Sequence, residues 1–253
     1  MNLTGHHAVI TGAGSGIGRA TAERLAEAGC QVTLIGRHIG RLQETADRIG
    51  DLAFAAPADV TDPDALAAAI EAGRDRFGPV DILINNAGAA TSAPFLKTDA
   101  DAFRAMLALN LEAPAEATRL ILPGMLTRRR GRIVNVASTA GLKGYAYVSA
   151  YVAAKHGLVG LTRALALEVA SKGVTVNAVC PGFTETDLVA RSVRSIMAKT
   201  GRSEDEARAA LAAENPQGRL ITPDEVAQTI VWLCGEGASG VNGTAVPVAG
   251  GEL

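Results

Sequence analysis

The sequence has few cysteines and no long apolar run. Its three cysteines, Cys30, Cys180 and Cys234, lie far apart and lack the spacing of metal ligands. An odd, scattered set argues against a disulfide framework or a zinc site, and favours buried or idle thiols in a reducing compartment. No apolar stretch approaches the roughly 18 residues of a membrane span, and the first residues lack the charged-then-apolar pattern of a signal peptide. We therefore expect a soluble cytoplasmic protein.

An excess of one charge sign is also missing. The 253 residues include 24 Lys and Arg and 26 Asp and Glu, which gives a formal net charge of −2. This balance predicts no affinity for nucleic acid or for a membrane surface. One basic run, TRRRGR at 127–132, goes against it, but the run directly precedes the apolar residues IVNV. We interpret it as the solvated face of a loop, and we expect no bound metal.

Apolar residues are abundant, at 48% of the sequence, which is enough for a large core. Short runs that are almost entirely apolar predict strands covered on both faces, at 7–11, 31–36, 52–56, 81–85, 132–136, 174–179 and 245–248. Helical stretches alternate with them, at 17–28, 39–49, 62–76, 99–126, 149–171 and 223–234. This alternation predicts an α/β fold, with a doubly wound, seven-stranded parallel sheet and helices on both faces, as a single domain over residues 1–253.

One interval interrupts the alternation. Residues 183–222 separate a strand from the next helix by about 40 residues, which is longer than an ordinary connection. Its middle has the pattern of an amphipathic helix. An insertion after the carboxyl end of a strand is a candidate substrate lid.

A glycine-rich stretch, TGAGSGIG at 11–18, follows the first predicted strand and opens the first helix. Glycines allow a tight turn and a close approach to a pyrophosphate, and the helix N-terminus supplies amide donors. The motif alone would be weak, and a purely structural turn is the alternative. Because strand, turn and helix all occur in order, we favour a dinucleotide site. The spacing of Gly12, Gly16 and Gly18 differs from the commoner G-x-G-x-x-G pattern.

The end of the second predicted strand bears on the choice of cofactor. An acidic residue there would bind the adenosine ribose and select NAD, but the sequence reads Gly36-Arg37. A guanidinium can pair with a 2′-phosphate, so NADP(H) is favoured and NAD(H) remains possible. The alternative is an ordinary surface arginine at a strand end.

The stretch SAYVAAKHG places Tyr151 and Lys155 one turn apart on the same face of a predominantly apolar helix. A nearby ammonium should lower the pKa of the phenol and make it a usable proton donor and acceptor. Ser138 follows a predicted strand, at the edge where open α/β sheets form their sites. Asn110 lies inside a predicted helix, where an exposed and a functional asparagine are equally expected.

In this order and spacing, TGAGSGIG, NNAG (85–88), Asn110, Ser138, YVAAK and PGFTET (181–186) resemble the short-chain dehydrogenase/reductase family over essentially the full length. The resemblance implies a Rossmann-like fold and an oxidoreductase that uses a nicotinamide cofactor. It implies that Tyr151 is the general acid/base and that Ser138 polarises the carbonyl. It further implies that Lys155 lowers the pKa of Tyr151 and binds the nicotinamide ribose, and that Asn110 holds a water for proton relay.

The same resemblance implies a set of cofactor contacts. They comprise the glycine turn, the end of the second strand, two residues beside the adenine, the NNAG segment, the catalytic pair and the carboxamide loop: Gly12, Ser15, Gly16, Ile17, Gly18, Arg37, Asp59, Val60, Asn86, Ala87, Gly88, Tyr151, Lys155, Pro181, Gly182, Thr184 and Thr186. Two positions depart from the family pattern, Ala249 where a polar residue is usual and Thr184 where an aliphatic one is usual. Neither carries the chemistry.

The substrate and the assembly are less closely specified. The segments around Ser138, Tyr151 and 174–186 resemble ketoreductases of 3-oxoacyl thioesters and polyketides, whereas a dehydrogenase of a small alcohol, hydroxy acid or sugar and a non-catalytic cofactor-sensing regulator are alternatives. Specificity is expected in loops 89–97, 139–147 and 183–215.

Family members usually form dimers or tetramers through helices that correspond to 99–126 and 149–171. The second of these is apolar on more than one face, through Val152, Leu158, Val159, Leu161, Leu165 and Leu167, so we expect a homodimer or homotetramer; burial under the 183–222 insertion is the alternative.

Overall fold

Parallel strands form one sheet in the order β3-β2-β1-β4-β5-β6-β7 in the computed structural model, which describes residues 2–253. The strands are β1 (His7–Thr11), β2 (Gln31–Gly36), β3 (Ala53–Pro57), β4 (Ile82–Asn85), β5 (Gly131–Val136), β6 (Val174–Pro181) and β7 (Ala245–Val248). The predicted doubly wound, seven-stranded parallel sheet is confirmed.

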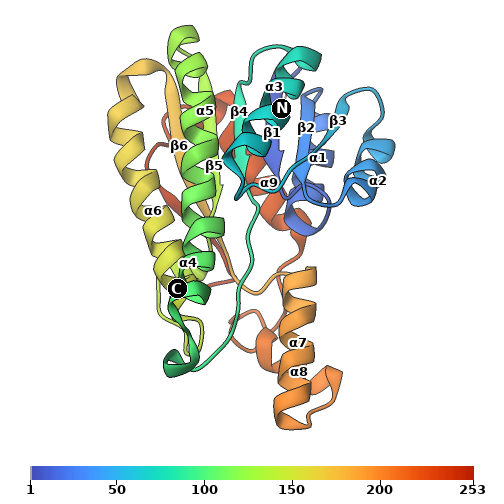
Figure 1. The fold of residues 1–253 in the computed structure, drawn as a ribbon, viewed down its shortest axis with the longest axis vertical. Helices are drawn as coiled ribbons and strands as arrows, with labels where there is room; N and C mark the ends of the chain where they lie inside the picture. The colour runs from blue at the N-terminus through green and yellow to red at the C-terminus, as the bar shows by residue number, and fades with distance from the viewer. Residues whose placement is uncertain (1) are drawn as a thin grey trace.

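Helices cover both faces of this sheet (Figure 1). They are α1 (Gly16–Glu27), α2 (Ile39–Ile49), α3 (Pro63–Phe77), α4 (Ala100–Leu107), α5 (Ala113–Arg128), α6 (Ser149–Val169), α7 (Asp187–Thr200), α8 (Glu204–Ala212) and α9 (Pro223–Cys234). Several begin at a capping side chain. Asp62 accepts bonds from the amides of Asp64 and Ala65 at the start of α3, and Thr222 forms a capping box with Glu225 in α9.

The helix predicted over 99–126 is not continuous, and this is a correction. A π-helical turn, Ala108–Glu112, separates α4 from α5. Asn110 lies inside this turn and is fully buried, and its Nδ2 donates to the carbonyl of Met106 at 3.0 Å. The side chain thus competes for the carbonyl that an α-helix would offer to a backbone amide.

Successive residues of each strand face opposite helical layers. In β1, Ala8 and Ile10 belong to the apolar cluster built with α1, α2 and α9, whereas Val9 belongs to the cluster built with α3, α5 and α6. Strand β4 repeats the pattern around Leu83. Because both faces are buried, the strands read in the sequence as apolar runs without alternation.

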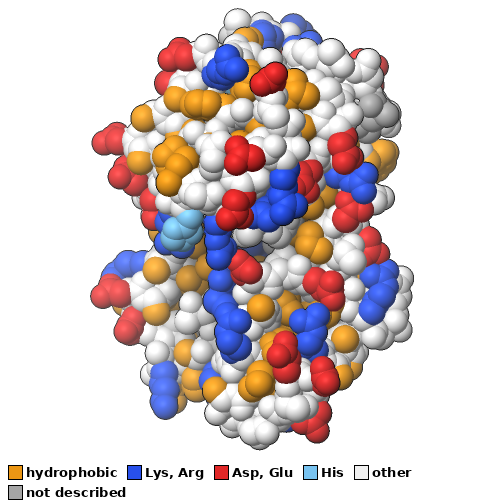
Figure 2. All heavy atoms as spheres, turned by 90° about the vertical axis from the view of Figure 1, so that its right-hand side faces the viewer, with side chains coloured by type: hydrophobic (Ala, Val, Ile, Leu, Met, Phe, Trp, Pro, Cys, Tyr) orange, Lys and Arg blue, Asp and Glu red, His pale blue; other side chains and the backbone are white. Residues whose placement is uncertain are grey.

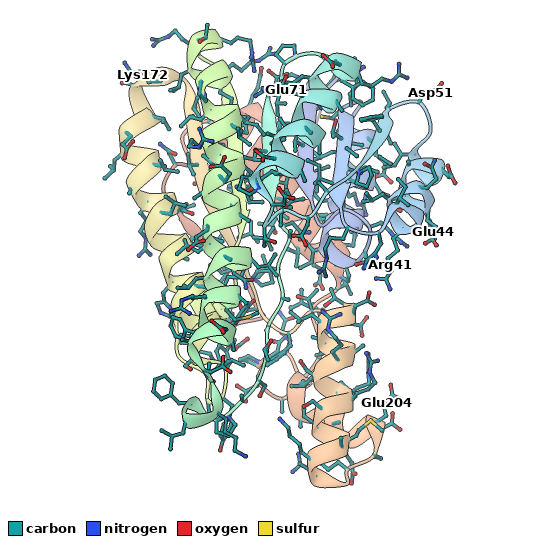
Figure 3. The ribbon with its side chains drawn as sticks, in the orientation of Figure 1. Arg41, Glu44, Asp51, Glu71, Lys172 and Glu204 are labelled. Carbon is teal, nitrogen blue, oxygen red and sulfur yellow. The ribbon has the colours of Figure 1, made fainter. Side chains whose placement is uncertain are left out.

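The carboxyl ends of the strands meet at the edge of the sheet that faces α7 and α8. Strand β1 pairs with both β2 and β4, so the chain changes direction across the sheet at β1, and a crevice forms at such a point. In Figure 3, Arg41 and Glu204 lie toward this edge, whereas Asp51, Glu71 and Lys172 mark the other end of the molecule.

The 183–222 interval extends beyond that edge as α7 and α8 (Figure 1). The two helices share a small apolar cluster that includes Val189, Val193, Ala207 and Leu211. The predicted helical middle of the interval is thus confirmed, while its action as a lid stays a prediction.

A buried polar network joins the centre of the sheet to two helices. Asn85 Nδ2 donates to Asn135 Oδ1 at 2.9 Å and to Thr118 Oγ1 at 3.2 Å, and Asn135 Nδ2 donates to Thr162 Oγ1 at 2.9 Å. The Thr162 hydroxyl in turn donates to the carbonyl of Leu158 at 2.8 Å. The network fixes β4 and β5 against α5 and α6.

Within residues 2–253, no helix has both the length and the apolar character to cross a membrane. The same residues contain no group of three or more His, Cys, Asp or Glu placed to hold a metal ion. Cys30, Cys180 and Cys234 are free and buried, so the expectation of buried thiols is confirmed.

The network predicts a specific loss of stability. Thr162→Val should lower the free energy of unfolding by about 1–3 kcal/mol, because it leaves the buried amide of Asn135 without an acceptor. Thr127→Val is a matched control: its hydroxyl also donates four residues back, to Pro123, but it is exposed. Urea denaturation measures both variants, and equal effects would contradict the assignment.

Candidate active site

A cavity of about 1600 Å³ opens along the carboxyl edge of the sheet. Its walls come from the ends of β1, β4, β5 and β6, from parts of loops 89–97 and 139–147, and from α7. In Figure 2 this side of the molecule is hollowed across its middle, and Lys and Arg side chains gather along the hollow. Arg37, Arg41 and Arg191 are among the residues that line the cavity.

This cavity brings together all of the predicted site residues except Gly18 and Asn110. Those on its wall are Gly12, Ser15, Gly16, Ile17, Arg37, Asp59, Val60, Asn86, Ala87, Gly88, Ser138, Tyr151, Lys155, Pro181, Gly182, Thr184 and Thr186. Gly18 and Asn110 are buried immediately behind it. Their shared location agrees with the predicted site, and the individual roles remain predictions.

The glycine turn fits the phosphates of a dinucleotide. Gly12 has φ +68°, and a Cβ there would lie 2.8 Å from Asn86 Nδ2; Gly16 has φ +53°, and a Cβ there would lie 2.9 Å from Thr186 Cγ2. A Cβ on Gly18 would lie 2.2 Å from the carbonyl oxygen of Gly12, so Gly18 packs α1 against the turn. These contacts leave room only for glycine, and the α1 N-terminus offers its amides to an anion.

Thr11 holds the turn against the neighbouring strand, and the sequence interpretation missed it. Its Oγ1 accepts from the amides of Asn86 and Ala87, both at 3.0 Å. Asn86 returns a bond from its Nδ2 to the carbonyl of Thr11 at 2.9 Å. A threonine at the end of an apolar strand gave no local signal, because its partners lie 75 residues away in the sequence.

The adenosine end of the cavity contains Arg37 and Asp59. The Arg37 side chain is 69% exposed, and its Nη1 lies 4.0 Å from Asp59 Oδ2. Hydrogen bonds from the backbone and hydroxyl of Thr61 lower the pKa of Asp59. Among residues 2–253 this long, exposed pair is the one ion pair of the Arg37 guanidinium. Because such a pair is weak, the side chain can turn toward a phosphate at the cavity mouth.

Three predicted catalytic side chains lie at the end of the cavity away from Arg37: Ser138, Tyr151 and Lys155. Lys155 is 3% exposed, and its Nζ donates to the carbonyl of Val136 at 2.8 Å and lies 5.7 Å from the centre of the Tyr151 ring. Ser138 Oγ accepts from the amide of Ala140 at 3.1 Å. The hydroxyl proton of Ser138 is left for a second acceptor, which is Tyr151 in this structure and can be a ligand oxygen once one is bound.

The pKa of Tyr151 differs from the expectation. Burial raises it, a hydrogen bond with Ser138 lowers it, and the nearby Cys180 raises it. The expected lowering by Lys155 is not seen in this structure. The Lys155 ammonium is also buried, and burial lowers the pKa of Lys155 to about 8. Lys155 therefore loses its proton at a lower pH than Tyr151 does.

Asn110 does not line the cavity; it is buried and bonded to Ala89, which does. Its Nδ2 donates to the carbonyl of Ala89 at 3.0 Å and its Oδ1 accepts from the amide of Ala89 at 3.3 Å. A Cβ on Gly88 would lie 2.9 Å from Asn110 Oδ1 and 3.6 Å from Lys155 Nζ. Gly88 therefore lies directly between the asparagine and the lysine, and the helical break at 108–112 is what brings Asn110 there.

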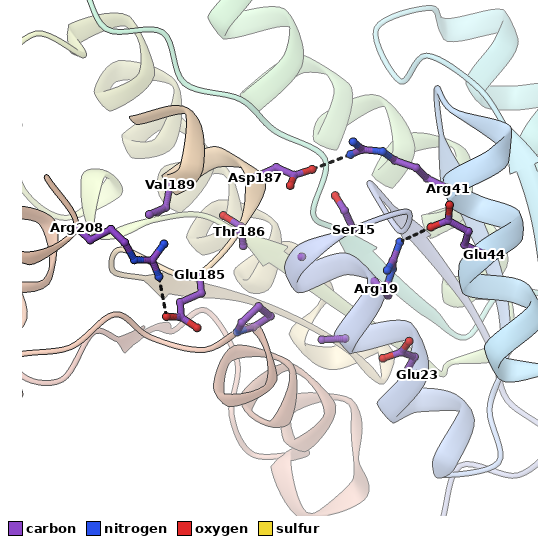
Figure 4. Close-up of a pocket in the computed structure, with 13 residues that line it drawn as sticks. Ser15, Arg19, Glu23, Arg41, Glu44, Glu185, Thr186, Asp187, Val189 and Arg208 are labelled. Atoms are coloured by element: carbon purple, nitrogen blue, oxygen red, sulfur yellow. Dashed lines mark hydrogen bonds and ion pairs between the residues drawn. The ribbon is translucent and has the colours of Figure 1, made fainter. Parts of the chain in front are cut away.

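The start of α7 is tied to the nucleotide side by an ion pair that the sequence did not indicate. Arg41 Nη1 on α2 lies 2.7 Å from Asp187 Oδ2, and a second pair joins Arg208 to Glu185 at 3.1 Å (Figure 4). Both pairs line a side pocket of about 690 Å³ that adjoins the main cavity at Ser15. Both are largely exposed, so each contributes little to stability.

Comparison with known proteins gives a consistent picture. Residues 6–196 match the short chain dehydrogenase family. The 3-oxoacyl-[acyl-carrier-protein] reductase FabG of Vibrio cholerae is 39% identical over 251 residues, which is 99% of this chain and 98% of that protein. The D-beta-hydroxybutyrate dehydrogenase of Rhizobium meliloti is 37% identical, over 96% of this chain and 97% of its own.

A solved structure has the same fold. A single-residue variant of actinorhodin polyketide ketoreductase, solved with NADPH, superimposes with a TM-score of 0.94 at 37% identity, over 98% of this chain and 97% of its own.

A doubly wound sheet with a glycine turn at its switch point and a Ser-Tyr-Lys set beside it defines a nicotinamide-dependent oxidoreductase. The chain belongs to the short-chain dehydrogenase family.

The geometry predicts that Tyr151→Phe abolishes turnover. Only the hydroxyl is removed, so kcat should fall at least about 100-fold, the lower end for positioned acid/base catalysis. The dissociation constant of the cofactor, measured by fluorescence titration, should stay within about twofold, because the ring remains. A near-native rate in this variant would exclude Tyr151 as the acid/base.

Proposed function

We propose that the protein is an NADP(H)-dependent ketoreductase that interconverts a ketone, of the 3-oxoacyl thioester type or a related ketone, and its secondary alcohol. The observation that carries the proposal is that Ser138, Tyr151 and Lys155 line one cavity, which has the largely exposed guanidinium of Arg37 at its nucleotide end. The printed activities of the relatives from V. cholerae and of actinorhodin ketoreductase support the substrate class, and the NADPH bound in the latter structure supports the cofactor.

In the proposed reaction, a bound nicotinamide supplies or accepts the hydride. Tyr151 donates its proton to the carbonyl oxygen during reduction, and the raised pKa keeps it protonated until transfer. Ser138 donates a hydrogen bond to the same oxygen. Lys155, charged near neutral pH, stabilises the phenolate that forms. We expect Asn110, behind Gly88, to hold the water that returns the proton.

A second candidate is the dehydrogenation of a small hydroxy acid. The hydroxybutyrate dehydrogenase of R. meliloti supports it, since that relative covers nearly the whole chain. The same three side chains serve either direction, because a proton donor in reduction is the acceptor in oxidation.

An assay that follows the absorbance of the reduced nicotinamide tests both candidate functions. A 3-oxoacyl thioester, a cyclic ketone, 3-hydroxybutyrate and a sugar alcohol are compared at equal concentration. The proposal expects the highest kcat/KM for the ketones with NADPH. Preference for 3-hydroxybutyrate would favour the second candidate, and no turnover with any substrate would favour a cofactor-sensing regulator.

Arg37→Ala should weaken NADP(H) and leave NAD(H) almost unchanged. Only NADP(H) carries the 2′-phosphate, and a charge-assisted bond contributes about 1.5–3 kcal/mol, which corresponds to roughly 10- to 150-fold in the dissociation constant. Arg48→Ala is the control, since Arg48 lies on α2 with only a 3.9 Å pair to Glu23. Equal losses for both cofactors, or a wild type that prefers NAD(H), would contradict the assignment.

We also propose that α7 and α8 act as a substrate lid. Support comes from their position beyond the carboxyl edge and from their attachment through exposed ion pairs. Amide hydrogen exchange across 187–215 should be faster than in the sheet without ligands, and should slow when cofactor and substrate are added. Unchanged exchange would count against a lid.

The outer face of α6 supports a homodimer or homotetramer. Leu167 is 83% exposed, whereas Leu158 is fully buried and Val159 is 2% exposed. Leu167 belongs to the C-terminal end of α6, and this end lies away from α7 and α8 (Figure 1), so the insertion does not cover it. Multi-angle light scattering at micromolar concentration should give a mass of two or four chains, and a monomer mass would refute the proposal.

We propose a cytoplasmic location as well. The support is that all three cysteines are free and buried, as in a reducing compartment. Labelling of the unfolded protein, taken from its source without reductant, should modify all three thiols.

A further inference from the structure

Residues 249–253 fold underneath the loop that joins β5 to α6. Gly250 and Gly251 both have positive φ, +61° and +95°, which turns the segment back toward the carboxyl edge. The end of the chain lies near the lower ends of α4 and α6 in Figure 1. This turn places the side chain of Glu252 inside the protein, where it is 1% exposed. A carboxylate so deeply buried requires charged or hydrogen-bonding partners.

The partners all come from the 139–147 loop. Lys143 Nζ lies 3.0 Å from Glu252 Oε1, and the hydroxyl of Tyr145 donates to the same oxygen. Thr139 Oγ1 lies 2.7 Å from the Tyr145 hydroxyl. Because the single phenolic proton is given to the carboxylate, the threonine must be the donor in that second bond. The bonds therefore run in one direction, from Thr139 to Tyr145 to Glu252.

This series of bonds ends beside the reacting groups. Thr139 is the residue after Ser138, and both line the cavity with Tyr145. The Tyr145 ring meets the ring of Phe183, across the cavity end of β6, at 6.2 Å between centres and 82° between planes. Burial, followed by the bond to Glu252, raises the pKa of Tyr145, so the phenol remains a donor at neutral pH.

The other carboxylate oxygen of Glu252 lies against Gly182, the residue that follows β6. This atom, Oε2, is buried without a hydrogen-bond partner in the part of the chain that the structure describes, and a Cβ on Gly182 would lie 2.8 Å from it. The side chain is therefore enclosed between the 139–147 loop on one side and Gly182 on the other. Tyr145 and Gly182 both line the cavity, so Glu252 lies between two parts of the cavity wall.

We propose that Glu252 is a positioning residue for the substrate: through Tyr145 and Thr139 it fixes the wall beside Ser138 and presents the Tyr145–Phe183 rings to the group next to the carbonyl. Since the Tyr145 hydroxyl is already committed to Glu252 and Thr139, the Tyr145–Phe183 part of this wall offers aromatic surface and no free hydroxyl of Tyr145. It suits an apolar flanking group. The inference deepens the proposed ketoreductase function and rests on it.

The test combines kinetics with amide hydrogen exchange. Glu252→Ala should raise KM for an apolar ketone about tenfold, with kcat reduced only a few-fold and the dissociation constant of NADPH unchanged. Glu252→Gln, which keeps an acceptor oxygen, should recover part of the loss. Leu253→Ala is the matched control, because Leu253 is 51% exposed and next in sequence. Exchange across 139–147 should accelerate in Glu252→Ala and not in the control.

A double-mutant cycle with Tyr145→Phe separates positioning from general stability. If Glu252 acts through Tyr145, the double variant should be no worse than the more impaired single variant. Additive losses, a parallel loss of NADPH affinity, or unchanged exchange across 139–147 would each overturn the proposal. If the wild type turns over no ketone, the proposed function fails, and the exchange measurement still decides whether Glu252 holds the loop.

Discussion

The contact between the ends of β1 and β4 is the constraint on which the site depends. Thr11 accepts two amide hydrogen bonds from the residues after β4, and Asn86 returns one to the carbonyl of Thr11. These bonds set the glycine turn against the NNAG segment without the space that any side chain would need. A cofactor lying across this switch point is then directed from the α1 N-terminus toward the Ser138 end of the cavity.

Burial has opposite consequences for the two titrating groups at that end. It raises the pKa of Tyr151 and lowers the pKa of Lys155 to about 8. Burial is the largest cause of both shifts, since a low-dielectric site disfavours phenolate and ammonium alike. In the proposed reaction, the phenol is therefore protonated before proton transfer, and the ammonium stabilises the phenolate that forms afterwards. Proximity alone, as read from the sequence, suggested the opposite shift for the tyrosine.

The sheet and helix α7 differ in the contacts that fix them in place. The sheet is fixed by continuous apolar layers and by the Asn85–Asn135–Thr162 network. By contrast, α7 meets the nucleotide side through the exposed Arg41–Asp187 pair. The chain thus combines a sheet edge held by buried contacts with a segment, α7 and α8, whose ion pairs are exposed to solvent. The pair between Glu252 and Lys143 differs from these exposed pairs, because the Glu252 side chain is only 1% exposed.

Local sequence was sufficient to determine the strands, most helix boundaries, the glycine turn and the position of Tyr151 and Lys155 on one helix face. Each of these follows from spacing within a few residues, which the chain geometry fixes directly. Only the tertiary structure decided the rest. The break at Asn110 depends on where its amide finds a carbonyl, and the pKa of Tyr151 depends on how deeply it is enclosed. Thr11 and Glu252 gain their partners 75 and 107 positions away, where no local pattern records which side chains packing will bring together.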